Sequence, residues 1–234
     1  MHTTPEQART GRRERPSKAA LSRESIVAAT LKLLDEGVER LTMRRVAAEL
    51  DTGPASLYVY VRDTEELHTA VLEELLGASG LLDTTPDDDR TWRERLVVLL
   101  MRYTGMLMTY PSVARVTAFS RPLGPNYVRL VESLLDLLVQ GGVPLPVAGW
   151  GVDLLLQQAE TTAVEQGQRG AEREASENEA QRAAIRELVA AGSPDHPHLV
   201  ALGEDIVSGE GPARGAWGFE VLINGLLTTP RPDS

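Results

Sequence analysis

Cysteine is absent from the 234 residues, so the chain holds neither a disulfide framework nor a thiolate zinc site, and the cytoplasm is the expected compartment. Long apolar runs are missing as well: no stretch approaches the roughly 18 uninterrupted apolar residues that a membrane span needs. Residues 1–20 are polar and contain no apolar segment that resembles a signal peptide. These absences predict an intracellular protein with no membrane partner.

No segment alternates convincingly between apolar and polar residues, so an all-α fold is expected. Prolines, glycines and capping residues divide the chain into a flexible basic arm (1–20), a helical head (21–76) and a second helical domain (77–234). Helices of the second domain are expected at about 92–109, 112–119, 126–139, 146–166, 173–191, 197–207 and 213–227.

Two short helices with a tight turn between them are predicted from Thr42 onward. Asp51 tolerates the left-handed backbone that the turn needs, and Pro54 suits the first position of the second helix. The inward positions, at helical spacing, are Val46, Ala47, Leu50, Leu57 and Val61. The rings of Tyr58 and Tyr60 are left on outer or flanking faces, which is the pattern of a helix-turn-helix that reads DNA.

Further helices are predicted on both sides of this motif. Ser22, with Glu24 in the first turn, starts one helix, and Gly37 ends it. After the motif, Asp63 and Glu66 have the spacing of a capping box at the start of a long helix. The result is a three-helix head joined by a long helix to the rest of the chain.

Charge is divided unevenly between the two parts of the chain. The total is −10, yet residues 1–62 hold 11 Lys and Arg against 8 Asp and Glu. The head therefore attracts phosphate, whereas the acidic remainder repels it. The positive charge ahead of the first helix comes from Arg9, Arg12, Arg13, Arg15 and Lys18. This segment is either a solvated tail or an arm that contacts the DNA backbone or minor groove.

These residues resemble those of a known family. The stretch from Ile26 to Leu76 is similar to the DNA-binding domain of the tetracycline-repressor (TetR) family through Ala47-Ala48, the turn, Ser56-Leu57-Tyr58 and Val61. The chain from Trp92 to about Gly167 is similar to the effector domain of tetracycline repressors through Trp92, Ala114, Arg121-Pro122, Tyr127, Leu130 and Gly141.

The resemblance implies a transcriptional regulator with a helix-turn-helix head and a helical-bundle effector and dimerisation domain. Its expected partners are a double-stranded DNA operator of pseudo-palindromic sequence, a small-molecule effector that releases the repressor, and a second copy of the chain. No cofactor and no metal site are expected. The effector would shift the spacing of two heads that meet successive major grooves about 34 Å apart.

The resemblance also implies which residues contact DNA. Arg44 matches a base-contacting arginine of tetracycline repressors, and its guanidinium can make two hydrogen bonds to guanine. The full predicted set is Thr42, Arg44, Pro54, Ala55, Ser56, Tyr58, Val59 and Tyr60. Tyr58 has the alternative of packing within the head. Asp51 and Thr64 depart from the glycine and lysine that are common at these family positions, so the operator sequence does not transfer.

Effector-binding residues are predicted from the segments that line the cavity in the resembling repressors, and from polar residues on the long helix. They are Tyr103, Met106, Thr117, Arg121, Leu130, Ser133, Leu154, Gln157, Gln158 and Thr161. The polar members have the alternative of facing solvent. Thr117 stands where tetracycline repressors have a metal-coordinating histidine, which argues against magnesium-bound tetracycline as the effector.

The helices at 146–166 and 213–227 are the predicted dimer interface, with burial in the core of one chain as the alternative. Each mixes small and apolar residues: Ala148, Gly149, Gly151, Leu155 and Ala159 in one, and Ala216, Gly218, Val221, Leu222, Gly225 and Leu226 in the other. The resemblance favours the interface, because family members pair two such helices from each subunit in a four-helix bundle.

Two other functional classes have weaker support. An enzyme would need a site, and the one candidate cluster, His196 and His198 near Asp195, is interrupted by Pro197 in a segment that is typical of an exposed loop. No G-x-G-x-x-G, P-loop or G-x-S-x-G motif is present. A helical protein-interaction module would explain the amphipathic helices but would leave Arg44 without a role.

Overall fold

The fold is taken from a computed structural model, which describes residues 20–38, 40–83, 89–120, 122–167, 171–192, 194–209 and 211–232. Every regular element in these ranges is a helix, as the sequence predicts. The elements are α1 (Arg23–Asp35), α2 (Met43–Glu49), α3 (Pro54–Leu57), α4 (Thr64–Ala78), α5 (Trp92–Thr109), α6 (Pro111–Phe119), α7 (Pro125–Gln140), α8 (Leu145–Gly167), α9 (Ala171–Ala191), α10 (Pro197–Leu202), the 3-10 helix η1 (Gly203–Val207) and α11 (Gly211–Thr228).

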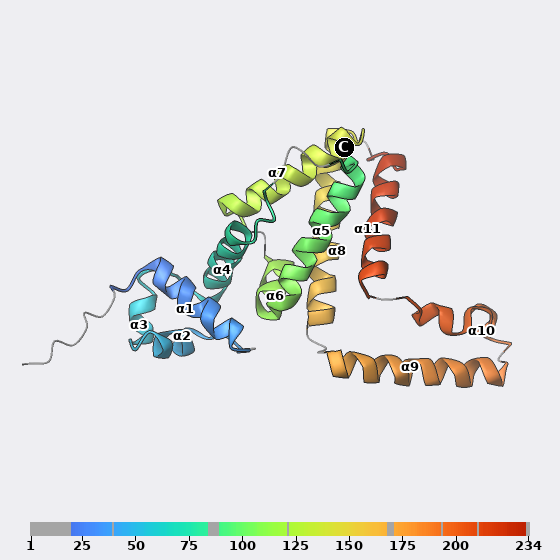
Figure 1. Ribbon diagram of the computed structural model, residues 1–234, viewed down its shortest axis with the longest axis horizontal. Coiled ribbons are helices and arrows are strands. Elements are labelled where there is room, and N and C mark those ends of the chain that lie inside the picture. The colour runs from blue at the N-terminus through green and yellow to red at the C-terminus, as the bar shows by residue number, and fades with distance from the viewer. Residues whose placement is uncertain are drawn as a thin grey trace, which may run out of the picture.

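Helices α1 to α3 and the start of α4 form the head, which Figure 1 shows at one end of the molecule. Its core is a single apolar cluster made of Ile26, Leu33, Leu41, Met43, Val46, Ala47, Leu57, Val61 and Leu67. Gly37 follows α1 with φ +82°, and Asp51 in the turn has φ +48°. Both left-handed positions agree with the sequence prediction, because glycine and Asp tolerate this region of backbone space.

Some local details of the head differ from the expectation. Helix α3 ends at Leu57, and the chain continues through a turn to Val61, whose side chain is buried as predicted. Leu50 is only partly buried. Helix α1 begins at the Ser22 cap with Glu24 in its first turn, as predicted, and Ser22 also forms a capping box with Ser25.

Helix α4 links the head to the body. Its first turns give Leu67 to the head core, whereas Val71, Leu72 and Leu76 belong to the larger apolar cluster of the body. Farther along, the Glu73 carboxylate accepts hydrogen bonds from the backbone N–H groups of Asn126 (2.8 Å) and Tyr127 (2.9 Å) at the start of α7. A side chain of α4 therefore caps α7.

The body is a helical bundle in which α8 contacts α5, α6, α7 and α11. Glycines allow two close approaches: a Cβ at Gly151 would lie 2.6 Å from Leu226 of α11, and one at Gly141 would lie 2.6 Å from the Trp92 ring of α5. Helix α9 packs with α10 and η1, and this group lies to one side of the bundle in Figure 1.

Among the described residues no single helix is long and apolar enough to cross a membrane. The pair α5 and α6 passes on length and composition together, but the two helices meet at an angle of 118°.

Candidate functional site

The turn that follows α3 presents side chains to solvent. Tyr58, Val59 and Tyr60 are 54%, 78% and 37% exposed, while Leu57 and Val61 on either side are buried. Burial at both ends holds the backbone of the turn against the head core, and the three side chains between them point outward. The structure therefore places Tyr58 outside the head core, not within it.

The other predicted DNA-contacting residues lie on α2 and α3. Arg44 is exposed on α2, and Pro54 and Ala55 are exposed at the start of α3, with Ser56 half-buried beside them. Thr42 caps α2, where its hydroxyl oxygen accepts a hydrogen bond from the Arg45 N–H at 3.3 Å. The hydroxyl proton of Thr42 remains available for an acceptor such as a phosphate oxygen.

An ionic network formed by Arg23, Arg62 and Glu66 joins the turn after α3 to α1 and α4. The Arg23 guanidinium donates to the Tyr60 carbonyl oxygen at 3.1 Å and to the Glu66 carboxylate at 2.8 Å. Glu66 also accepts from the Arg62 backbone N–H (2.8 Å) and from Arg62 Nε (3.0 Å). These bonds lower the pKa of Glu66 to about 2, with the backbone bond from Arg62 as the largest cause.

This network corrects one part of the sequence prediction. Asp63 accepts from the Glu66 N–H at 2.8 Å, as a capping box requires. The Glu66 carboxylate bonds to the N–H of Arg62 instead of that of Asp63, because the two arginines draw it toward the turn. Glu66 thus joins α1, the turn and α4.

The body contains a buried polar pair. Tyr103 of α5 is fully buried and its hydroxyl donates to Glu160 Oε1 of α8 at 3.1 Å. Burial raises the pKa of Glu160 to about 8, an effect that the Tyr103 hydrogen bond opposes and the charge of Asp153 increases. Burial, followed by the charge of Glu160, also raises the pKa of Tyr103. A carboxyl group of this kind changes its protonation state near neutral pH.

The predicted effector residues do not form one described cavity. Thr117 and Leu130 are buried with Tyr103 in the body, and the Thr117 hydroxyl donates to the Val113 carbonyl oxygen at 2.9 Å. Met106, Ser133 and Gln158 are half-buried, whereas Leu154, Gln157 and Thr161 are exposed along α8. Arg121 lies outside the described residues, as do Arg9, Arg12, Arg13, Arg15 and Lys18 of the arm.

A cavity of about 550 Å³ lies between α7, α8 and the segment before α7. Leu154 is the predicted effector residue that lines it. Its other lining residues are Pro122, Leu123, Tyr127, Val131, Gly149, Trp150, Val152, Asp153 and Leu156. The volume falls within the usual range for small-molecule sites, and an apolar lining with a few polar groups is typical of them.

In the described part of the chain, no group of three or more His, Asp or Glu side chains is placed to hold a metal ion. His196, Pro197 and His198 lie exposed at the start of α10. His68 of α4 is buried and its Nδ1 donates to the Thr64 carbonyl oxygen at 2.6 Å. It lines a hollow of about 370 Å³ together with residues of α6.

Comparison with known proteins identifies the family. A family model described as "Tetracyclin repressor-like, C-terminal domain" matches residues 85–229, which is more than half of the chain. The chain belongs to the tetracycline-repressor family. It is 37% identical over 142 residues to the HTH-type transcriptional repressor DrrR1 of Streptomyces coeruleorubidus, a match that covers 58% of this chain and 51% of that repressor. The matched part therefore spans about half the length of this relative.

Solved structures of the same family agree in fold. A transcription regulator from Streptomyces coelicolor is 43% identical, with a TM-score of 0.72 over 93% of this chain and 100% of that one. The tetracycline-repressor-family protein ActR of Streptomyces coelicolor, in complex with actinorhodin, is 32% identical, with a TM-score of 0.76 over 89% and 98% of the two chains. The resemblance inferred from the sequence is confirmed, and the chain is a DNA-binding transcriptional regulator of the tetracycline-repressor family.

The sequence analysis did not predict three carboxylates that join separate elements by hydrogen bonds: Glu66, Glu73 and Glu160. Glu160 carried a usable signal, because it lies four residues after the buried Leu156 and next to the buried Ala159, on the inner side of α8. A carboxylate at such a position needs a partner within the core. The partners of Glu66 and Glu73 come from elements distant in the sequence, and no local pattern marks them.

Proposed function

We propose that this member of the tetracycline-repressor family is a homodimeric, cytoplasmic repressor that binds a pseudo-palindromic operator and is released by a small organic effector. The chain keeps the proposed division into a basic arm (1–20), a DNA-binding head (21–76) and an effector and dimerisation domain (77–234). The observation that carries the proposal is the exposed turn after α3, formed by Tyr58, Val59 and Tyr60 and called the recognition turn below. It is held on a head core that is separate from the core of the body. No catalytic role is proposed.

The proposed DNA surface consists of α2, α3 and the turn that follows. Arg44 supplies the side chain for guanine recognition, and the exposed rings of Tyr58 and Tyr60 lie where they can contact bases or phosphates. The hydroxyl groups of Thr42 and Ser56 serve phosphate oxygens. The Arg23–Glu66 bridge supports this surface by holding the Tyr60 carbonyl oxygen in place.

The proposed effector site is the cavity between α7 and α8. ActR, which the chain resembles over 89% of its length, has been solved in complex with actinorhodin. An effector held against α7 has a short route to the head, because α4 contacts both α6 and α7 and carries the head at its other end. Ligand binding and operator binding are then coupled through the position of α4.

The proposed dimer interface combines α8 and α11. Large apolar side chains remain exposed on both helices: Trp150 and Leu154 on α8, and Trp217 and Val221 on α11. Helices α8 and α11 contact each other, so these side chains lie on one two-helix unit. Burying that unit against a second copy removes the exposed apolar surface from water and places two heads on one axis.

The first experiment is selection of binding sites from random duplex DNA with the purified full-length protein. We expect a pseudo-palindrome, bound by a dimer and weakened by salt because phosphate contacts release counterions. The same weak affinity for selected and random duplexes would refute the proposed repressor.

Effector binding is then tested on the selected operator. We expect actinorhodin, used as the probe, to reduce operator affinity and to quench the fluorescence of Trp150 in the cavity. Val131→Phe fills the cavity from α7, away from the proposed dimer interface, and should abolish both effects, while Val139→Phe, at an exposed position of the same helix outside the cavity lining, serves as the matched control. Identical responses of the two variants would exclude this cavity as the effector site.

A further inference from the structure

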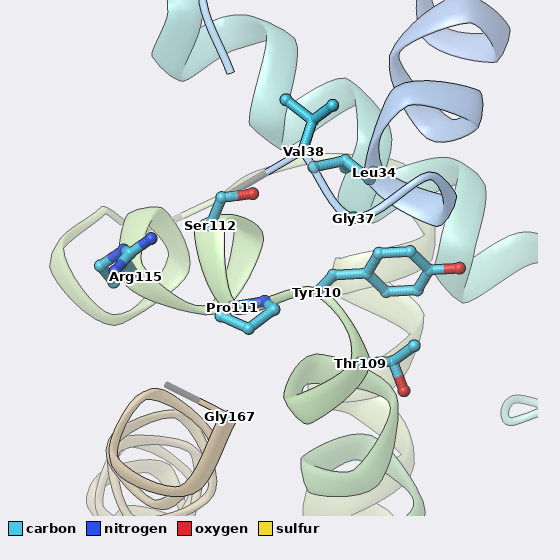
Figure 2. A pocket seen from close by; sticks show the side chains of 9 residues that line it. All are labelled: Leu34, Gly37, Val38, Thr109, Tyr110, Pro111, Ser112, Arg115 and Gly167. Carbon is cyan, nitrogen blue, oxygen red and sulfur yellow. The ribbon is translucent and has the colours of Figure 1, made fainter. Parts of the chain in front are cut away.

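A second cavity lies at the junction of head and body, apart from the proposed effector site. Its volume is about 280 Å³, and Figure 2 shows the residues that line it. Leu34, Gly37 and Val38 come from the head at the end of α1. The opposite side is formed by the corner between α5 and α6, with Gly167 at the end of α8 completing it. None of these residues belongs to the predicted DNA or effector sites.

One side of this cavity is the uncapped N-terminus of α6. The helix begins with Pro111 after Tyr110, and no side chain caps it. The N–H groups of Val113 and Ala114 bond back to the Tyr110 carbonyl oxygen, but the N–H of Ser112 has no acceptor among the described residues. The first turn of the helix thus offers a free N–H group and the positive end of the helix dipole.

The Ser112 side chain is a second, independent sign of a missing ligand. Ser112 is only 9% exposed and lines the cavity, and its hydroxyl oxygen is buried with no hydrogen-bond partner among the described residues. A buried hydroxyl left unsatisfied is costly, so native structures seldom keep one without a partner. A bound acceptor at this place would satisfy both the N–H and the hydroxyl of one residue.

Charge and shape define what kind of acceptor fits. Arg115 lies one turn further along α6, lines the same cavity and forms no ion pair with an acidic side chain in the described part of the chain. A helix N-terminus next to a free arginine favours an anion. Leu34, Val38 and Pro111 add apolar surface to the cavity, and Thr109 and Tyr110 also line it.

We propose that this junction cavity binds a small organic acid. Its carboxylate accepts hydrogen bonds from the N–H and hydroxyl of Ser112 and pairs with Arg115. Its apolar part lies between Leu34 and Val38 of the head and Pro111 of the body. The cavity volume of about 280 Å³ lies just below the usual range for drug-sized ligands, which suits a smaller aromatic or short aliphatic carboxylic acid.

A ligand in this cavity touches both α1 and α6, so it fixes the head against the body. Head and body are already joined near this cavity by one hydrogen bond, which the Tyr110 hydroxyl donates to Asp35 Oδ1 at 3.0 Å. The regulatory consequence rests on the proposed function: the acid then acts as a second input that changes operator affinity independently of the effector between α7 and α8.

Calorimetric titration of the full-length protein with benzoate, without DNA, tests the binding site. We expect saturable binding of benzoate, with inorganic phosphate and benzyl alcohol each at least tenfold weaker, because one lacks the apolar part and the other the charge. Arg115→Gln should weaken benzoate binding at least tenfold and Ser112→Ala about threefold or more. Arg129→Gln, at an exposed arginine of α7 outside the cavity, should leave it unchanged.

The contrary outcomes are distinct. Equal benzoate affinity in Arg115→Gln and Arg129→Gln, or equal binding of benzyl alcohol, would overturn the anion site, and equal binding of phosphate would overturn the organic acid. Because this titration contains no DNA, failure of the operator selection leaves its result intact. Benzoate that binds as expected yet leaves the affinity for the selected operator unchanged would confirm the site and refute its regulatory role.

Discussion

Replacing Glu66 with alanine removes the carboxylate that joins α1, the recognition turn and α4. The pKa of Glu66 falls from 4.5 to about 2 on folding, a shift that corresponds to about 3 kcal/mol at roughly 1.4 kcal/mol per unit. Its partners are exposed, Arg23 by 44% and Arg62 by 85%, so solvent screening reduces this figure. We expect Glu66→Ala to lower the free energy of unfolding by about 1–2 kcal/mol near neutral pH.

The dependence on pH separates this electrostatic contribution from simple loss of packing. Because folding lowers the pKa of Glu66, its stabilisation is fully present above the unfolded value of 4.5 and is lost as the pH falls toward about 2. The assay is urea unfolding followed by circular dichroism at a series of pH values. Glu65→Ala, at the exposed neighbour, is the control. Equal stability of the two variants at about pH 6, or a difference that persists undiminished to about pH 2, would refute the reasoning.

Three other perturbations probe the DNA surface, the buried pair and the dimer. Arg44→Ala should cost about 1–3 kcal/mol of binding to the selected operator and much less to random duplex, as measured by fluorescence anisotropy; equal losses would exclude base recognition. The pKa of Glu160 in the folded protein is about 8, above its ordinary value. The free energy of unfolding of the wild type should therefore fall relative to that of Glu160→Gln as the pH rises from about 5 to about 8, by at most about 1.4 kcal/mol per pH unit. Parallel pH profiles of unfolding for the two proteins would contradict this. Val221→Arg on α11 should convert dimer to monomer in sedimentation velocity, whereas Val139→Arg, which is equally exposed at 48% but lies on α7, should remain dimeric; two dimers would argue against the α8–α11 interface.

Sequence alone predicted those features that depend on neighbouring residues. The backbone of Gly37 and Asp51 and the position of Pro54 follow from local sterics, and the structure agrees with each. The extent of most helices was predicted to within two residues, because prolines and capping residues mark their ends. Helix α3 is shorter than expected, since burial of Val61 decides where that segment packs, whether or not it is helical. The single helix predicted at 197–207 is divided into α10 and the 3-10 helix η1, because the chain adopts a left-handed backbone at Gly203, with φ +54°.

Features that join distant segments were beyond the sequence. Glu66 was assigned a capping role with its neighbour Asp63, yet its carboxylate also pairs with Arg23, which lies 43 residues away. The Tyr103–Glu160 pair spans 57 residues. The spacing of residues in one helix indicates which of them share a face, but not which other helix that face meets. The junction cavity was unforeseen for the same reason.

The cap that Glu73 places on α7 also limits how the head can move. Both hydrogen bonds are short, and a shift of α4 along its axis by more than about 1 Å would lengthen them beyond useful range. A Cβ at Gly124 would lie 2.1 Å from the Glu73 carboxyl carbon, so the chain before α7 leaves the carboxylate little room to follow. Rotation about Glu73 keeps the bonds, whereas sliding breaks them. Glu73 is therefore a pivot. A small rotation of α4 about Glu73 produces a larger displacement at the recognition turn, because that turn lies farther from Glu73.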